Sequence, residues 1–481
     1  MKKQNHVSEK RKRRRKKNER KAIILAVLVV ISVIALAVTL AAFVFKADFF
    51  VDKNREEQKN RQENDAQPEI EVTVEDAANQ SDHGGGLDDT DLGRTDGSNP
   101  DQPDRSAVQK DENVQVLQDV TMIFAGDICF YDAYANMTAL RARGGKIESC
   151  IDEKLLAEMK AADICMVNNE FAYSDRGTPL ADKAFTFCSK PSNVSLLHDM
   201  GVDLVSLANN HVYDYGPDAL LDTLDTLKNA DIPYVGAGRD LSEASAVYYF
   251  EKNGRRIAFV SATQVERNEH PDTKGATDTT PGTFRCYTKD EFERLAAVIR
   301  EADAQADLTV VYVHWGTENT DELHWAQIEQ APQIVEAGAD LIIGDHPHCL
   351  QNVEYLNGVP VIYSLGNFWF NSKTLDTCLF KVIYRTDGKL DCRLIPAKQH
   401  DCRTDMETGS EKQRILDYMQ CISPDVTFDP DGNITNTPYT GPKIDYDAVE
   451  RVPDPPAAAT PLPVADPAGP VPDDITPVPV Q

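Results

Sequence analysis

The feature of this 481-residue chain that most constrains its fold is a series of short, continuous apolar runs between positions 120 and 368. Such runs, without polar alternation, are typical of strands that are buried on both faces. Stretches with helical spacing separate them, and alternating strands and helices predict an α/β domain. The predicted strands are Val120–Asp127, Ala162–Glu170, Asp203–His211, Arg256–Thr263, Asp307–Gly316, Asp340–His348 and Val359–Phe368, and the predicted helices are Asp152–Ala162, Pro217–Ala230, Lys289–Ala304 and Ala326–Ala337.

A further block, residues 374–421, predicts two or three more strands. The Asp-Gly pair at Asp387 and Gly388 is typical of a tight turn between two of them. We expect this block to complete the second sheet of the domain.

The segment Ala22–Phe45 contains 24 residues without a single charge. At about 1.5 Å per residue, a helix of this length crosses a hydrocarbon core of about 30 Å. A cleaved signal peptide is the main alternative, but its apolar region is normally about 7–15 residues long and ends at small residues. We therefore predict an uncleaved transmembrane helix over residues 22–45.

The charges that flank this segment predict its orientation. Residues 1–21 contain 12 Lys or Arg and only 2 Glu, and such basic flanks remain in the cytoplasm. The expected location is therefore the cell membrane, with a single pass, a basic cytoplasmic segment (1–21) that also contacts membrane lipid, and the main domain outside the cytoplasm. The whole chain carries a net charge of −28, which argues against a nucleic-acid partner.

Composition predicts the limits of the folded domain. Residues 46–118 are acidic and poor in apolar residues, which indicates a disordered stalk, and residues 426–481 are Pro-rich, which indicates a disordered tail. The folded domain is expected over residues 119–425. Disulfides are permitted outside the cytoplasm, and Cys392 and Cys402 are the pair that we would test first.

Polar residues of metal-ligand type follow five of the predicted strands. The carboxyl ends of parallel strands converge on one crevice, so these residues are expected to meet there. Carboxylate, amide oxygen and imidazole together suit zinc, manganese or iron, and two such ions about 3.5–4 Å apart stabilise the attacking and leaving oxygens of phosphate-ester hydrolysis. Each residue alone has a plainer reading, such as a helix cap. The set comprises Asp127, Glu170, Asn209, Asn210, His211, His314, His346 and His348.

Six motifs carry a resemblance to a known family. FAGD, VNNEF, SLANNHVYDYG, VHWGTE, GADLIIGDHPHCLQ and VIYSLGNFWF occur in this order between Thr121 and Phe370. In order and spacing they closely resemble the CapA family, whose members are associated with bacterial capsule and poly-γ-glutamate biosynthesis. The resemblance implies a four-layer α/β/β/α sandwich of the metallo-dependent phosphatase type with two divalent metal ions.

The resemblance also implies a role for each residue of the set. Asp127 and His348 would bind the first metal, Glu170 would bridge the two metals, and His211 would be the catalytic residue that faces the leaving group. The second metal would be bound by Asn210, His314 and His346, while Asn209 and Glu318 would support the ligands, and Asn367 would contact substrate.

Two positions depart from the pattern. Cys129 stands where phosphatases of this fold commonly have a metal-binding histidine, so one ligand of the first metal is missing or is supplied from elsewhere. Asp345 stands where the family often has a histidine or a small residue. Asp345 either adds a carboxylate that favours harder ions or caps a turn, and we favour the cap.

The expected function is therefore that of a membrane-anchored, extracytoplasmic protein of capsule, poly-γ-glutamate or other cell-envelope polymer biosynthesis. We expect a metal-dependent hydrolase site of phosphoesterase type, acting on a cell-envelope polymer or another phosphate-containing substrate. Two alternatives stay open. The protein is a non-catalytic partner of membrane polymer-synthase subunits in a synthesis or export complex, or it is an anchored phosphatase or nuclease.

Overall fold

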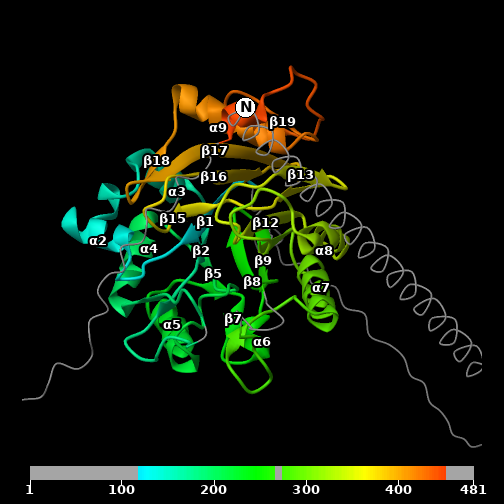
Figure 1. Cartoon of the computed structure of the whole chain (residues 1–481). Helices are drawn as coiled ribbons and strands as arrows, with labels where there is room; N and C mark the ends of the chain where they lie inside the picture. The colour runs from blue at the N-terminus through cyan, green and yellow to red at the C-terminus, as the bar shows by residue number, and fades with distance from the viewer. Residues whose placement is uncertain (1–116, 182, 266–273, 451–481) are drawn as a thin grey trace, which may run out of the picture. The chain divides into compact units, whose positions relative to one another are not determined.

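A computed structural model of the protein describes residues 117–181, 183–265 and 274–450, and two β-sheets contain most of its strands (Figure 1). The predicted cytoplasmic segment, transmembrane helix and most of the predicted stalk lie outside these residues. Within the described ranges, no helix is both long enough and apolar enough to cross a membrane.

The larger sheet is mixed. Its ten strands are β1 (Val120–Ile128), β2 (Ile164–Asn169), β5 (Leu204–Ser206), β6 (Tyr234–Val235), β15 (Asn367–Trp369), β16 (Leu375–Tyr384), β17 (Leu390–His400), β18 (Arg403–Met406), β19 (Thr427–Phe428) and β20 (Asn433–Thr435). Their order is β19-β20-β17-β16-β1-β2-β5-β6, with β15 beside β1 and β18 beside β17. Strands β1, β2, β5 and β6 are parallel, whereas β16 runs antiparallel to β1.

The smaller sheet has a parallel centre. Its six strands are β8 (Tyr248–Lys252), β9 (Arg255–Thr263), β11 (Leu308–His314), β12 (Leu341–Asp345), β13 (Val353–Leu356) and β14 (Val359–Ile362). Strands β9, β11, β12 and β14 are parallel, and the edge strands β8 and β13 are antiparallel to their neighbours. Two short pairs complete the strands: β3 (Ala172–Tyr173) with β4 (Cys188–Ser189), and β7 (Ala237–Gly238) with β10 (Gly282–Thr283).

Helices cover the outer faces of the two sheets (Figure 1). On the larger sheet lie α3 (Glu153–Ala161), α4 (Ser195–Met200) and α5 (Pro217–Asn229), and on the smaller sheet lie α7 (Lys289–Asp303) and α8 (Trp325–Glu336). The remaining helices are α2 (Ala135–Ala142), α6 (Leu241–Ala244), α9 (Gly409–Ile422) and α10 (Tyr446–Val449), with short 3₁₀ turns η1 (Ile147–Ser149) and η2 (Pro191–Val194).

Successive side chains of β1 enter two different hydrophobic cores because strand side chains alternate between faces. Phe124 lies in the core between the sheets, together with Phe259 of β9 and Tyr312 of β11. Ile123 lies in the core under α3 to α5. A third core joins the smaller sheet to α7 and α8. The α/β class and the continuous burial expected of the central strands are thus confirmed.

The C-terminal block completes one of the two sheets, as we expected. Its strands β16 and β17 form with the predicted turn at Gly388, and β16 pairs with β1 in the larger sheet. The predicted start of the disordered tail at residue 426 is wrong. Val426 and Val449 are buried in the core between the sheets, and Arg414 Nη1 donates to the Val449 carbonyl at 2.7 Å, so ordered chain continues to residue 450. Residues 451–481 lie outside the description.

The structure does not join Cys392 and Cys402, the pair that we would test first for a disulfide. All ten cysteines lie in described residues and are free thiols. Cys392 lies near the start of β17, and Cys402 lies in the turn beyond its far end. At about 3.3 Å per residue, the strand keeps the two roughly 25 Å apart, far beyond the reach of a disulfide.

Candidate metal centre

The predicted site residues come together at the carboxyl ends of parallel strands from both sheets. Asp127 lies at the end of β1, Glu170 directly follows β2, and His314 ends β11. The backbone is tightly packed at this point, because a Cβ atom on Gly126 would lie 1.9 Å from the carbonyl oxygen of Gly366. Glycine at position 126 therefore allows β1 to pass close to the segment that leads into β15.

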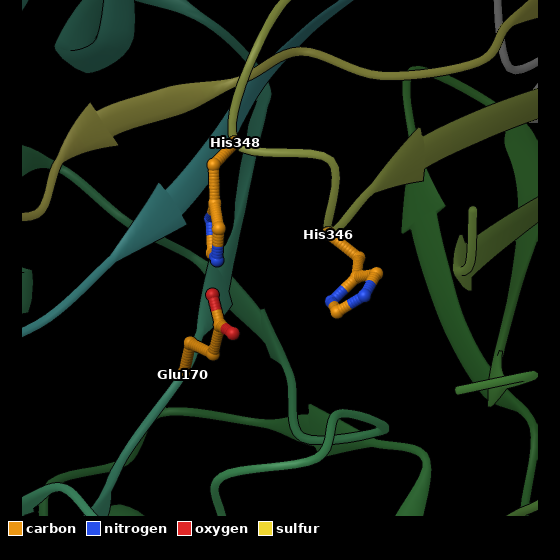
Figure 2. Close-up of side chains that lie close together, drawn as sticks. All are labelled: Glu170, His346 and His348. Atoms are coloured by element: carbon orange, nitrogen blue, oxygen red, sulfur yellow. The ribbon is translucent and has the colours of Figure 1, made fainter. Parts of the chain in front are cut away.

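Ligand-type atoms form two clusters, and within each they lie within 4.8 Å of one another. One contains Glu170, His346 and His348, whose side chains converge in Figure 2. The other contains Asp127, His314 and Asp345. The resemblance implied that Asp127 and His348 share a metal. In the structure His348 belongs to the cluster with Glu170 and His346, and its Nδ1 also lies 3.0 Å from Oδ2 of Asp127.

The Glu170 carboxylate is fully buried, and neither of its oxygens has a hydrogen-bond partner among the described residues. Burial and the nearby charge of Asp127 raise the pKa of Glu170 well above its usual value. In the described part of the chain, Nδ1 of His346 and Oδ2 of Asp345 are buried and unpartnered too. Unpaired buried acceptors are costly unless a cation satisfies them, so these residues fit divalent metal ions.

His314 is held between the two sheets. Its Nδ1 lies 2.8 Å from Oδ1 of Asp345, and its Nε2 lies 2.8 Å from Oδ1 of Asn210. Burial lowers the pKa of His314 to about 3, so the ring is neutral. In one tautomer Nδ1 donates to Asp345, and the lone pairs of Nε2 and of the Asn210 oxygen are then left for a bound cation; in the other tautomer Nε2 donates to Asn210.

His348 is oriented by two acceptors, since its Nδ1 lies 3.0 Å from Oδ2 of Asp127 and 2.8 Å from Oδ1 of Asn367. Its Nε2 is left to face Glu170 (Figure 2). Burial alone would lower the pKa of His348, but its hydrogen bond to Asp127 and the nearby charges of Asp127 and Glu318 together outweigh burial, and the pKa is raised. His346 and His348 have φ values of 94° and 57°, rare for non-glycine residues and typical of strained functional loops.

His211 forms part of a chain of ionic contacts that we did not predict. Its Nδ1 lies 2.6 Å from Oδ2 of Asp214, whose Oδ1 lies 2.6 Å from Nζ of Lys183. Lys183 also donates to the carbonyl of Asn210. Oδ2 of Asp214 also accepts a hydrogen bond from the backbone N–H of Phe187, which shows that this carboxylate is an acceptor. His211 therefore donates from Nδ1 to Asp214. Burial lowers the pKa of His211, so a neutral ring presents its Nε2 3.8 Å from Oε1 of Glu170.

Two asparagines support the ligands. Asn209 accepts from the backbone of His211 and donates to Asn168 Oδ1, as expected of a supporting residue. Asn168 was missed, although it directly precedes the NE pair of the motif, and it donates to Asp127 at 2.9 Å. Glu318 is exposed on the wall of a neighbouring cavity, where it acts on Glu170 only through its charge.

The two departures from the family pattern have different outcomes. The favoured interpretation of Asp345 as a turn cap is wrong, because its buried carboxylate contacts His314 in the second cluster. Cys129 is buried in the core beneath the helices, and burial raises the pKa of its thiol well above the usual value. Neither cluster of ligand-type atoms in the described residues includes Cys129, so its thiol does not replace the expected histidine.

A cavity of about 540 Å³ opens beside the two clusters. Asn210, His211 and His346 lie in its inner wall, and Trp325 in its outer wall is half exposed. The other tryptophans, Trp315 and Trp369, are core residues. Its remaining lining residues are Lys183, Ala184, Phe185, Gln264, Val265, Tyr287, Gly316, Thr317, Glu318 and His324.

Sequence relatives match about half of the chain. The "PGA biosynthesis protein CapA" of Bacillus subtilis is 33% identical over 241 residues, which cover 49% of this chain and 61% of that protein. The "Capsule biosynthesis protein CapA" of Bacillus anthracis is 33% identical over 240 residues, or 49% and 57%. A "Probable polyglutamine synthesis accessory protein" of Mycobacterium tuberculosis is 27% identical over 213 residues, or 44% and 56%. The chain thus spans about three fifths of the length of these relatives.

A solved structure of a hypothetical protein from Thermus thermophilus aligns with 58% of this chain and 99% of its own, at a TM-score of 0.34 and 16% identity. That likeness is too remote to support an argument. The family model described as "Bacterial capsule synthesis protein PGA_cap" matches residues 121–372, which contain every ligand of both clusters. Because this match covers more than half of the 481 residues, the protein belongs to the bacterial capsule synthesis PGA_cap family.

Proposed function

We propose that the domain is a metal-dependent hydrolase of phosphoesterase type, built on a metallo-dependent phosphatase version of the α/β/β/α sandwich. Its substrate is a cell-envelope polymer or a phosphate-containing precursor of one. Family membership and the names of the Bacillus relatives support a role in capsule or poly-γ-glutamate biosynthesis.

One observation carries the chemical part of the proposal. The carboxylate of Glu170 is completely buried, has no hydrogen-bond partner in the described chain, and lies against the imidazoles of His346 and His348. Divalent ions bound here would stabilise the negative charge that develops during phosphoester hydrolysis.

The chain itself positions a proton-transfer group at this site. Asp214 holds the Nδ1 proton of His211, which leaves Nε2 directed toward Glu170 and lining the cavity. A neutral imidazole in this orientation accepts a proton at Nε2 and can return it to a leaving oxygen. His211 therefore serves as the proton-transfer residue in this proposal.

Membrane attachment is part of the proposal. It rests on the uncharged segment Ala22–Phe45 and on the basic residues before it. Cell fractionation followed by N-terminal sequencing of the mature protein tests it. A mature N-terminus beyond Phe45 would contradict an uncleaved anchor.

The hydrolase proposal is tested on the full-length protein, purified in detergent. We expect bound metal by plasma mass spectrometry and hydrolysis of bis(p-nitrophenyl) phosphate. Glu170→Gln and His346→Ala should each lose most of both signals. His198→Ala is the matched control, because this exposed imidazole hydrogen-bonds to the Ala230 carbonyl and lies outside both clusters. Absence of bound metal and of hydrolysis in the unmodified protein would overturn the proposal.

A second candidate is a non-catalytic binding subunit that works with membrane polymer-synthase partners. The word "accessory" in the name of the Mycobacterium relative favours it. In that case polymer production in cells would survive Glu170→Gln, and the full-length protein would co-purify with synthase subunits from membranes. Loss of polymer in the Glu170→Gln strain would favour the hydrolase instead.

A further inference from the structure

Gln264 is a buried side chain in the cavity wall that the proposed chemistry does not use. It directly follows β9, and its backbone N–H donates to the His314 carbonyl at 2.8 Å, which fixes its position against the metal-ligand strand β11. The side chain is 3% exposed and lines the cavity with Asn210 and His346. Its Nε2 has no hydrogen-bond partner among the described residues. An amide donor buried in this way is costly unless something that enters the cavity accepts from it.

The outer part of the same cavity has a different character. Phe185 and Trp325 line it and are 65% and 51% exposed, among the few large apolar side chains exposed in the described ranges. Exposed aromatic side chains beside a cavity commonly mark a binding surface, because their flat faces contact planar or ring-shaped groups. A cavity of about 540 Å³ is also far larger than a phosphate group requires. The ligand should therefore extend well beyond the group that reacts.

The charges of the cavity indicate the chemical class of the part of the ligand that extends beyond the reacting group. The ammonium of Lys183 is neutralised by Asp214 at 2.6 Å, and Glu318 places a carboxylate in the wall. Glu318 would repel a carboxylate placed beside it in the outer cavity, whereas an uncharged ring with hydroxyl or carbonyl acceptors fits both the aromatic wall and the amide donor.

We propose that this cavity binds a saccharide unit of the substrate, next to the group held at the metal centre. Phe185 and Trp325 contact the apolar face of the sugar ring, and Gln264 donates from Nε2 to one of its oxygen atoms. The inference rests on the proposed function and names the substrate class as a sugar-containing phosphoester rather than a polyglutamate chain.

Binding can be measured without catalysis, through tryptophan fluorescence. The chain has three tryptophans, and two are fully buried, so a change in emission reports on Trp325. We expect hexose 1-phosphate to change the emission of the metal-loaded full-length protein with saturation, and an oligomer of γ-glutamate to leave it unchanged. Trp325→Phe should abolish the signal. Saturable binding of the γ-glutamate oligomer but not of the sugar phosphate would overturn the proposal.

Kinetics test Gln264 separately from the metal centre. Two p-nitrophenyl phosphodiesters are compared, one carrying a hexose and one carrying only a methyl group. Gln264→Met keeps the length of the side chain but removes the donor, and we expect KM for the sugar diester to rise about tenfold, as for one lost hydrogen bond, with kcat unchanged. Phe185→Ala should also raise KM for the sugar diester alone. Ile328→Ala is the control, because Ile328 is exposed on α8 but does not line the cavity.

The outcomes separate the two proposals. If the unmodified protein hydrolyses both diesters equally well and Gln264→Met changes neither KM, the saccharide site is wrong while the hydrolase stands. If neither diester is hydrolysed but the fluorescence titration with hexose 1-phosphate still saturates, the hydrolase is wrong while the saccharide site stands. Thermal unfolding and metal content of Gln264→Met verify that the variant is folded, and Gln264→Glu provides a second variant that lacks the donor.

Discussion

Nδ1 of His211 lies 2.6 Å from Oδ2 of Asp214, and both side chains are buried. The carboxylate is itself held by Lys183 and by the backbone N–H of Phe187. The ring of His211 therefore has one orientation and one tautomer, with Nε2 at the cavity. Proton transfer by a ring fixed in this way requires no reorientation of the imidazole.

Replacing Asp214 with Asn should impair turnover more than binding. The amide can offer its N–H to Nδ1, which would move the proton of His211 to Nε2 and reverse the role of that atom. We expect kcat for a phosphodiester to fall about 10²-fold or more, with metal content preserved. Steady-state kinetics and metal analysis check this. Asp222→Asn is the control, because that carboxylate binds Ser174 and Arg176 away from the cavity, and equal kcat values in the two variants would contradict the role of Asp214.

Asp345→Asn tests whether the carboxylate beside His314 tunes a metal site. Asp345 Oδ1 lies 2.8 Å from His314 Nδ1 and directs Nε2 toward Asn210. Loss of a residue that orients a metal ligand typically lowers metal affinity about 10–100-fold. Titration of the metal-free protein with Zn²⁺ and Mn²⁺ should show this loss in one class of sites. Unchanged affinity for both ions would show that Asp345 has no part in metal binding.

The metal-free protein should lose stability as the pH rises above about 7. Burial raises the pKa of Glu170 and Asp345, and hydrogen bonding to Asp127 raises that of His348. The folded state then binds more protons than the unfolded state, so stability falls with rising pH until these groups have ionised. The pKa values of the other three site imidazoles are lowered, so these rings are neutral in both states above pH 7 and do not contribute; they are His211, His314 and His346.

Denaturant unfolding at pH 7, 8 and 9 in a chelator measures this dependence. Glu170→Gln removes one of the titrating groups, so its unfolding midpoint should be higher at pH 9 and should vary less with pH. Adding divalent metal to the unmodified protein should also flatten the profile, since a cation stabilises the ionised carboxylates. A midpoint that rises from pH 7 to pH 9 without metal would contradict the shifted pKa values.

Gly126→Ala should be among the more damaging single-methyl additions in the domain. The new Cβ would meet the Gly366 carbonyl at 1.9 Å and push β1 away from the chain that leads into β15. We expect a loss of about 2–3 kcal/mol in the free energy of unfolding, as for overpacked cores. Metal content should also fall, because Asp127 is the next residue. Gly388→Ala, in a hairpin turn with φ of 86° and open space around it, should cost about 1 kcal/mol and leave metal content intact.

Local patterns were sufficient to predict the central strands and most of the site. A continuous apolar run such as that of β11 needs two covered faces, and the polar residue that ends it, His314, then lies at the sheet edge. The sequence did not indicate which sheet the C-terminal block joins, because the antiparallel pairing of β16 with β1 connects residues more than 250 positions apart. No local signal encodes such a partner. We did not predict the role of Asp214, because in the sequence an Asp just before a helix is indistinguishable from a helix N-cap residue.

The two clusters draw their ligands from opposite halves of the sandwich: Asp127 and Glu170 lie at the ends of strands of the larger sheet, while His314 and His346 lie at the ends of strands of the smaller one. Bound ions would therefore cross-link the two sheets. A small slide of one sheet over the other would pull the ligands apart before it exposed any core. The metal affinity of this protein should therefore depend strongly on the alignment of the two sheets. Mutations in the core between the sheets, far from any ligand, should lower the metal content before they lower the stability of the fold.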